Sequence, residues 1–306
     1  MAEPKLSIVV PVYNRAAIVE KTLDSIAAQT LRPLSLILVD NNSTDSSLAV
    51  LEKWADSHRS GDFNIQVLKE TTPGPGAARN AGLDVVLTDW TMFFDSDDLM
   101  SPDHCARALA TAEANPQAGV VGWDLWLPGP GGASRYRPFV TKDMVRANIF
   151  ESIFSTQHYM ARSELLRRAG GWSTAGSVAE DAELGNRILM LHPVCVRMES
   201  RGETVTVVPA PESLMRGSAG TLAALEPALE AIRLQLPEKQ RHWIDLQYIC
   251  AACGWAASDA QGQVKVKNMI SRQPFFRRIL FRMFYYYGRG GGRGIGRIYR
   301  LITPEK

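Results

Sequence analysis

The sequence predicts an α/β domain with a mainly parallel sheet flanked by helices. Four apolar runs typical of buried strands alternate with segments whose apolar residues recur at helical spacing. The runs are 5–11, 35–40, 64–70 and 89–94, and the helical segments between them are 16–30, 47–58 and 77–87. Parallel strands need crossover connections, so this alternation favours a sheet covered on both faces.

Length and composition are those of a folded chain. With 306 residues, the chain suits one large α/β domain with an appendage, or two small domains. Hydrophobic residues make up 45% and charged residues 22%, which excludes a mainly disordered or collagen-like chain. The charge is uneven, because residues 272–300 contain eight of the 34 Lys and Arg and no acid, leaving 26 basic against 32 acidic residues elsewhere.

The cysteines and the apolar runs indicate a cytoplasmic location. Cys105, Cys195, Cys250 and Cys253 are too few and too scattered for a disulfide scaffold, and no secretion signal follows Met1. The last two cysteines form a CxxC without a second Cys/His pair, so helix packing is favoured over a zinc or redox site. No run reaches the roughly 20 apolar residues of a spanning helix, so we expect any membrane contact to be peripheral.

An acidic cluster, Asp95-Ser96-Asp97-Asp98, directly follows the apolar run WTMFF. Carboxylates at alternate positions can share one divalent ion, and Mg²⁺ or Mn²⁺ with oxygen ligands is the usual partner of a diphosphate. The alternative is that these Asp side chains cap a helix, since DDLMSPDHCARAL has the character of a helix start. The sequence favours the metal site.

Further polar groups follow the first two predicted strands, at Tyr13-Asn14 and Asp40-Asn41-Asn42. Ligands gather at the carboxyl ends of parallel strands, so these groups and the acidic cluster are expected to share one crevice. Asp40 and Asn41 suit a base or ribose contact, or an ordinary Asx turn. The loop TTPGPGAARNAG offers close backbone approach before a short helix, with Arg79 available for a phosphate or base contact, or simply as a surface residue.

The pair Glu180-Asp181 lies at the start of a predicted helix, where acidic residues are common because of the helix dipole. A carboxylate that faces the crevice would instead be a general base, taking a proton from an attacking hydroxyl. Only the combination with the other motifs favours this second interpretation.

Six segments, taken together, resemble a known family. In order and spacing, they are similar to the signatures of family 2 glycosyltransferases with the Rossmann-like GT-A fold. The six segments are PVYNR, VDNNSTD, GPGAARNAG, FFDSDD, RRAGGW and AEDAELGNRI. The resemblance covers about residues 5–215. It implies inverting transfer of a sugar from a nucleotide diphosphate donor, with a divalent metal, Mn²⁺ or Mg²⁺, on the diphosphate.

The resemblance also implies roles for individual residues. Tyr13 would line the base pocket beside Pro11, Asp40 or Asn41 would read the base, Asp95 would face the ribose, Asp97 would bind the metal and Asp181 would be the base. Arg79 and Ser96 would assist nucleotide-sugar binding, and Asp98, Glu180 and His158 are supporting or acceptor-side residues. His158 can equally be a structural residue, and Trp123 and Trp126 can form a sugar platform or pack in the core.

Two departures from the family pattern loosen the assignment. Relatives often carry a second Asp where this chain has Asn41, which leaves UDP-, dTDP- and GDP-sugars open as donors. The segment ESLMRGSAG keeps Arg216 and Ser218 of a family motif but lacks its His, so the metal would have Asp97 and the diphosphate as its strong ligands.

The expected organisation has three parts. A catalytic domain covers 1–215, with a nucleotide-sugar half to about 125 and an acceptor half over 126–215, in which 126–138 is expected to be a Pro/Gly-rich loop. A helical extension covers 216–270 and a basic aromatic tail covers 271–306. Aromatic residues and Arg alternate over 274–300, which is typical of a helix lying on an anionic membrane surface. Packing on the body and RNA binding are alternatives for this tail, and RNA is disfavoured.

The prediction is therefore a transferase peripheral to the cytoplasmic face of the inner membrane, acting on a glycan or lipid-linked acceptor and binding no nucleic acid. A silent nucleotide-binding scaffold of the same fold is one alternative. A nucleotidyltransferase is another, but VVPVYNRAA lacks the Gly-rich phosphate loop that those enzymes usually carry after the first strand.

Overall fold

The computed structural model describes residues 3–128, 134–175, 178–200, 202–208, 222–254, 256–292, 294, 295 and 298. The chain forms two compact units, Met1–Pro211 and Glu212–Lys306.

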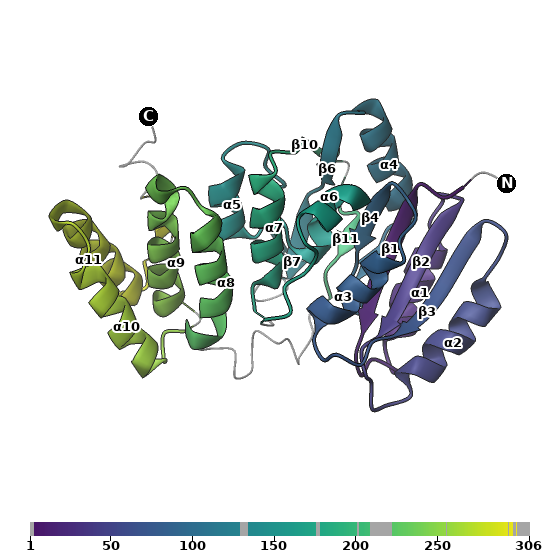
Figure 1. The fold of residues 1–306 in the computed structure, drawn as a ribbon, viewed down its shortest axis with the longest axis horizontal. Coiled ribbons are helices and arrows are strands. Elements are labelled where there is room, and N and C mark those ends of the chain that lie inside the picture. Colours follow the sequence, from purple (N-terminus) through teal and green to yellow (C-terminus); the bar gives the residue numbers. More distant parts are fainter. Residues whose placement is uncertain are drawn as a thin grey trace. The chain divides into compact units, whose positions relative to one another are not determined.

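The first unit is built on a seven-stranded sheet of order β10-β6-β9-β4-β1-β2-β3 (Figure 1). Its strands are β1 (Leu6–Val12), β2 (Leu34–Asp40), β3 (Phe63–Lys69), β4 (Trp90–Phe93), β6 (Ala118–Gly122), β9 (Tyr159–Arg162) and β10 (Val194–Arg197). β1 is parallel to β2 and β4, β2 to β3, and β6 to β10, whereas β9 is antiparallel to β4 and β6. The predicted mainly parallel sheet is confirmed.

Helices cover both faces of this sheet. Successive residues of a strand point to opposite faces, so Ile8 and Val10 belong to one apolar core and Val9 to the other. The first core includes buried residues of α1 (Val19–Ala27), α2 (Ser47–His58) and α4 (His104–Ala114). The second includes residues of α3 (Pro75–Asp84), α5 (Met144–Glu151), α6 (Ser163–Arg168) and α7 (Glu180–Met190).

A second sheet of four strands has the order β5-β11-β7-β8. The strands are β5 (Leu99–Met100), β11 (Val205–Thr206), β7 (Leu125–Pro128) and β8 (Ser134–Arg137). The prediction that 126–138 is a loop is wrong in part, because β7 and β8 pair as antiparallel strands with Trp126 opposite Tyr136. The rings of these two residues lie 5.2 Å apart, a cross-strand aromatic contact that favours pairing despite the Pro and Gly between the strands.

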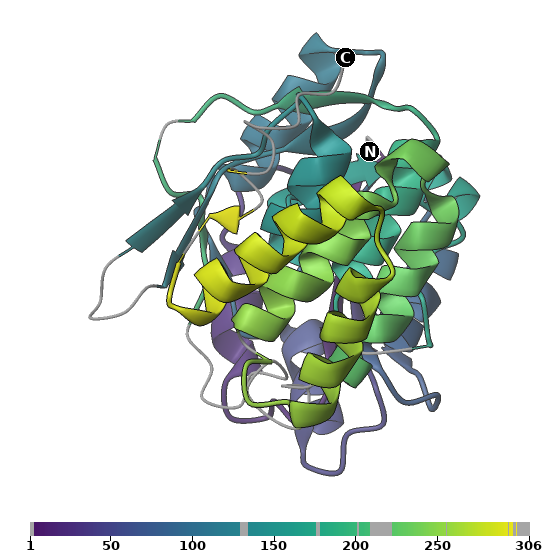
Figure 2. The same cartoon turned by 90° about the vertical axis from the view of Figure 1, so that its left-hand side faces the viewer.

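The second unit is helical, consisting in its described part of α8 (Leu222–Gln235), the short η4 (Glu238–Gln240), α9 (His242–Cys253), α10 (Ala260–Ser271) and α11 (Phe275–Arg289). α9 packs against α8, α10 and α11, which Figure 2 shows in green to yellow. The CxxC lies in α9, where Cys253 Sγ is 3.4 Å from the carbonyl oxygen of Tyr285 on α11 and all four cysteines are free thiols.

None of the helices within these described ranges has the length and apolar character needed to cross a bilayer.

Candidate functional site

The loops that follow β1 and β2 are joined by hydrogen bonds at the carboxyl end of the sheet. Asn14 Oδ1 accepts from the Thr44 backbone N–H at 2.8 Å, and the Asn14 N–H donates to Ser43 Oγ at 3.0 Å. Asn14 has a left-handed φ of 50°, a conformation that Asn tolerates better than most residues. Tyr13 beside it is 55% exposed, and Pro11 is half-buried. The ring of Tyr13 is therefore open to a ligand at this edge.

Asp40 and Asn41 are both buried after β2, but their side chains differ in what they contact. Asp40 Oδ2 accepts from the Ser43 N–H at 3.2 Å, while its buried Oδ1 has no hydrogen-bond partner among the described residues. Asn41 Nδ2 donates to the carbonyls of Thr72 at 2.7 Å and Glu70 at 3.2 Å, and its Oδ1 accepts from the Gly74 N–H at 2.8 Å. Asn41 thus braces the loop before α3, whereas Asp40 keeps one buried oxygen without a partner among the described residues.

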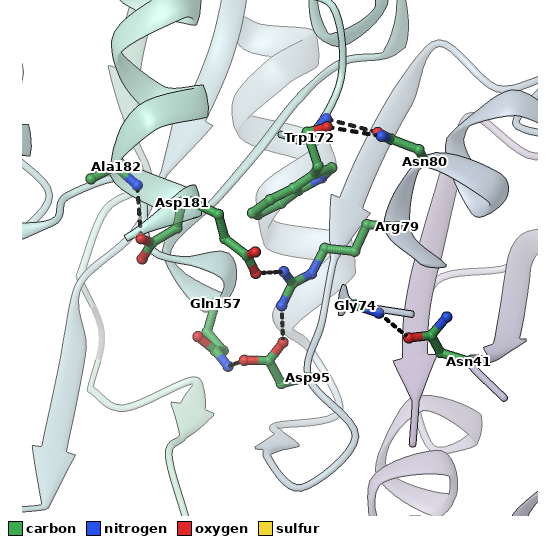
Figure 3. A network of polar contacts seen from close by, with 10 residues as sticks. Asn41, Gly74, Arg79, Asn80, Asp95, Gln157, Trp172, Asp181 and Ala182 are labelled. Atoms are coloured by element: carbon green, nitrogen blue, oxygen red, sulfur yellow. Dashed lines mark hydrogen bonds and ion pairs between the residues drawn. The ribbon is translucent and has the colours of Figure 1, made fainter. Parts of the chain in front are cut away.

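Arg79 lies at the centre of a buried ionic network (Figure 3). Its Nη2 donates to Asp95 Oδ1 at 2.9 Å, and its Nη1 donates to Glu180 Oε1 at 2.6 Å. The guanidinium also lies over the ring of Trp172, 4.3 Å from the ring centroid. Of the two expectations for Arg79, the surface position is wrong, because its side chain lies in the interior between two carboxylates. Contact with a nucleotide stays a prediction.

Trp172 is held in place by Asn80, as Figure 3 shows. Asn80 Nδ2 donates to the Trp172 carbonyl at 2.9 Å, and Asn80 Oδ1 accepts from the Trp172 N–H at 2.7 Å. The preceding Gly171 has a φ of +66°, and a Cβ there would lie 2.5 Å from Asn80 Oδ1. The segment RRAGGW therefore needs this glycine so that the tryptophan can lie beneath Arg79.

The acidic loop after β4 is held by Gln157, which the sequence analysis missed. Gln157 Nε2 donates to Asp95 Oδ2 and, at 2.5 Å, to Asp98 Oδ2. Asp98 Oδ1 accepts from the Val208 N–H at 2.9 Å, so Asp98 has partners at both oxygens. Burial, helped by the nearby Asp95 carboxylate, raises the pKa of Asp98 to about 8. The hydrogen bonds at both oxygens suit a structural role for Asp98, and Ser96, two residues earlier, is also buried.

Of the three carboxylates in the acidic cluster, Asp97 has the fewest contacts with other described side chains. Its nearest charged partner is Arg15, with 4.0 Å between Arg15 Nη2 and Asp97 Oδ2. Burial and the Asp95 carboxylate raise the pKa of Asp97, which is the expected state of a carboxylate that lacks a close cation. Within the described residues there is no group of three or more His, Cys, Asp or Glu side chains that could hold a metal. Asp97 offers a single carboxylate without a close cation, so a divalent cation held there would need its other oxygen ligands from a bound molecule or from solvent.

Asp181 is half-buried in the first turn of α7, one residue after the Glu180 that binds Arg79. Its Oδ1 accepts from the Ala182 N–H at 2.7 Å, a contact drawn in Figure 3. Burial raises the pKa of Asp181, and the Arg79 and Arg137 guanidiniums oppose this rise. A carboxylate with a raised pKa accepts a proton more readily, which is what a general base requires.

His158, the proposed acceptor-side histidine, is fully buried. Burial lowers its pKa to about 3, and its ring lies 5.7 Å from that of Phe139, edge to face. The structure therefore favours the structural interpretation of His158.

The two tryptophans proposed as a sugar platform differ in burial. Trp123 is buried and donates through Nε1 to the Gln157 carbonyl at 2.6 Å, whereas Trp126 is half-buried on β7. The segment 209–221, which includes Arg216 and Ser218, lies outside the described residues.

Comparison with known proteins finds glycosyltransferases by sequence and the same fold by structure. The family model described as glycosyl transferase family 2 matches residues 7–157. The uncharacterized glycosyltransferase EpsJ of Bacillus subtilis is 30% identical over 54% of this chain and 50% of its own length. The poly(ribitol-phosphate) beta-glucosyltransferase of Bacillus spizizenii is 36% identical over 42% of this chain and 20% of its own length. The chain thus spans half or less of each of these curated relatives.

Two solved structures share the fold across nearly the whole chain. S. aureus TarS 1–349 in complex with UDP-GlcNAc has a TM-score of 0.70 at 17% identity, covering 99% of this chain and 93% of that one. The mannosyltransferase PcManGT from Pyrobaculum calidifontis, in complex with GDP-Man and Mn²⁺, has a TM-score of 0.61 at 20% identity, covering 99% and 89%. At these identities the likeness establishes the fold, and the predicted GT-A class is confirmed.

Proposed function

Because residues 7–157 make this chain a member of glycosyl transferase family 2, we propose that it transfers a sugar from a nucleoside diphosphate donor to an acceptor hydroxyl. The transfer inverts the anomeric centre in a single displacement. The acceptor oxygen forms the new bond to the anomeric carbon, the bond from that carbon to the diphosphate oxygen breaks, and the nucleoside diphosphate leaves.

The observation that carries this proposal is the ionic connection from Asp95 through Arg79 to Glu180. It fixes the acidic loop after β4 relative to the start of α7. Asp97 and Asp181 are therefore held on two segments that share one rigid link. A displacement needs a charge acceptor for the leaving group and a proton acceptor for the nucleophile, held at fixed positions.

In the proposed mechanism Asp181 takes the proton from the acceptor hydroxyl as it attacks. Tyr13 lines the base pocket, and Asp40 accepts from the base through its unpartnered Oδ1. Arg15 lies 4.0 Å from Asp97 and supplies positive charge at the diphosphate end. Asp97 would hold a divalent cation, which when bound neutralises charge on the departing diphosphate.

The donor that we propose is a UDP-, dTDP- or GDP-sugar. TarS and PcManGT were solved with UDP-GlcNAc and with GDP-Man respectively, so the shared fold accommodates either base. The acceptor class we propose is a cell-surface glycan precursor, in keeping with the poly(ribitol-phosphate) named for one relative.

We further propose that α11 places the protein on an anionic membrane. Four side chains at helical spacing are exposed on α11: Phe276, Ile279, Met283 and Tyr286. Three arginines lie among them, Arg277, Arg278 and Arg282, and no Asp or Glu occurs from residue 260 to 304. An apolar stripe with basic neighbours matches the acyl boundary and anionic headgroups of a lipid surface.

The test of the transferase is nucleotide binding followed by donor turnover. Thermal stability of the whole chain is measured with UDP, dTDP, GDP and CMP, with and without Mn²⁺, for the wild type, Asp97→Ala and Asp181→Asn. A ligand at 100 times its Kd stabilises by about 2.7 kcal/mol. We expect one diphosphate to stabilise the wild type in a metal-dependent way, Asp97→Ala to lose the effect, and Asp181→Asn to keep it.

Turnover separates the enzyme from a silent scaffold. With the nucleotide identified, transfer of the sugar from the matching nucleotide sugar to water or to an acceptor, with release of the nucleoside diphosphate, should fall by about 10²–10⁴-fold in Asp181→Asn. Absence of binding by any nucleotide would overturn the proposal. Binding without turnover by the wild type would favour the scaffold.

A further inference from the structure

Arg137 stands out among the arginines of the first unit. It ends β8 opposite Leu125 of β7, and its side chain is half-buried. Arg135 lies two residues earlier on the same strand, so both side chains point to the same face of the hairpin. Burial, helped by the Arg135 charge, lowers the pKa of the Arg137 guanidinium. A cation in this position is poorly solvated and gains from any anion that approaches it.

The other buried or half-buried arginines described in this unit all have a partner in the protein. Arg79, Arg146 and Arg187 pair with carboxylates, Arg32 and Arg162 donate to backbone carbonyls, and Arg15 and Arg107 do both. The backbone of Arg137 pairs with Leu125 of β7, but no hydrogen bond and no ion pair within 4.0 Å joins its guanidinium to the residues that the structure describes. The guanidinium has five donors in a planar fork, and none of them is engaged by a described residue.

Two acids act on Arg137 from a distance, Asp181 and Glu151. Glu151 is also 4.0 Å from Arg146, so its charge is shared. Asp181 is the proposed base. The electrostatic interaction with Asp181 associates Arg137 with the end of the site where the acceptor hydroxyl would be activated, whereas Arg15 is 4.0 Å from Asp97 at the proposed diphosphate end.

We propose that Arg137, with Arg135 beside it, binds a phosphate group of the acceptor. The inference rests on the transferase proposal, since it takes Asp181 to mark the acceptor end. Guanidinium and phosphate form bidentate hydrogen bonds, which fix orientation as well as supply affinity. A phosphate bound there would also offset the Arg137 charge near Asp181, so the base would accept a proton more readily when this acceptor is in place. The acceptor class is accordingly a phosphate-bearing glycan precursor, either a phosphodiester polymer or a lipid-linked phosphate.

The experiment uses glycerol 3-phosphate as the probe and glycerol as its neutral twin. Calorimetric titration of the whole chain, with and without the saturating nucleoside diphosphate and Mn²⁺ found above, measures the Kd for wild type, Arg137→Gln and Arg137→Lys. Arg168→Gln is the matched control, because Arg168 is an exposed arginine on α6. We expect at least a tenfold weakening in Arg137→Gln, a smaller one in Arg137→Lys, less than twofold in Arg168→Gln, and no binding of glycerol.

Three outcomes would overturn the inference. Equal phosphate binding by the wild type and Arg137→Gln would remove Arg137 from any anion site. Loss of probe binding once nucleotide is saturating would assign Arg137 to the donor diphosphate instead. Tight binding of glycerol would show that the site does not recognise the phosphate group.

Nucleotide-dependent stabilisation is measured on the same samples, so that failure of the two proposals can be told apart. If this stabilisation is absent, the transferase proposal fails. If it is present and Arg137→Gln binds the probe as the wild type does, only the inference about Arg137 fails. Arg137→Lys keeps the test valid if Arg137→Gln does not fold.

Discussion

At the scale of single residues, Arg79 decides how the site is held together. Arg79 and Glu180 are buried and Asp95 is half-buried, and removing one member of such an ionic network leaves the others uncompensated. We expect Arg79→Met to lower the free energy of unfolding by about 3–5 kcal/mol, measured by urea denaturation. Lys5→Met, which removes an exposed ion pair with Glu113, should cost much less, because exposed pairs contribute little to stability. Equal effects of the two substitutions would contradict the role given to Arg79.

A second residue-scale prediction concerns acid sensitivity. His104 is fully buried against Trp123, and burial lowers its pKa to about 3. In the unfolded chain a His titrates near 6.5, so between about 6.5 and 3 the unfolded state binds the additional proton. Stability contributed by neutral His104 is thus present above pH 6.5 and is lost as the pH falls, by up to about 1.4 kcal/mol per pH unit.

We expect His104→Gln to flatten this acid slope, whatever it does to stability at pH 7.5. Urea denaturation at a series of pH values between 4.5 and 7.5 measures the slope. The exposed His192→Gln serves as the control and should leave the slope as in the wild type. A slope unchanged in His104→Gln would mean that other groups account for the acid sensitivity.

At the scale of elements, α3 packs so closely on the sheet that it requires a glycine. A Cβ on Gly82 would lie 2.3 Å from Val9 Cγ1 of β1 and 3.3 Å from Val39 Cγ2 of β2. Gly82→Ala should therefore destabilise the protein by about 1–3 kcal/mol through overpacking, although alanine favours helix. Gly119→Ala is less crowded, with 3.0 Å as its shortest contact, and should cost less in the same denaturation assay. A stabilised Gly82→Ala would show that helix propensity outweighs packing here.

The loop before α3 depends on an amide that can both donate and accept. Asn41 donates to two carbonyls of this loop and accepts from Gly74, and an aspartate could only accept. Asn41→Asp should lower stability by about 1–3 kcal/mol and increase hydrogen exchange of the Gly74 amide. Asn41→Asp with wild-type stability and exchange would mean that the loop keeps its conformation without this brace.

At the scale of the whole molecule, the sequence predicts those features of the fold and the site that depend on local patterns of residues. The alternation of strands and helices is written in short-range periodicity, and polar residues after the strands follow from topology. The partners of Arg79 could not be predicted, because Glu180 lies 101 residues away and the pairing depends on how α3 and α7 pack on the sheet. Gln157 carries no motif, and its contacts with Asp95 and Asp98 become visible only in three dimensions.

The uneven charge of the chain leads to the last prediction, which concerns membrane binding through α11. Each basic residue near an anionic surface contributes about 1 kcal/mol, so changing Arg277, Arg278 and Arg282 together to Gln should weaken binding by about 3 kcal/mol, on the order of a hundredfold. Co-sedimentation with vesicles of phosphatidylcholine containing phosphatidylglycerol measures this, and added salt should weaken wild-type binding by screening.

A control variant removes the same charge from the first unit by changing Arg59, Arg168 and Lys53 together to Gln. It should leave binding within a few-fold of wild type. Phe276→Ser with Met283→Ser should also weaken binding, since the exposed apolar stripe would enter the interface. Equal sedimentation with pure phosphatidylcholine, or an unaffected α11 triple variant, would rule out this surface as the membrane contact.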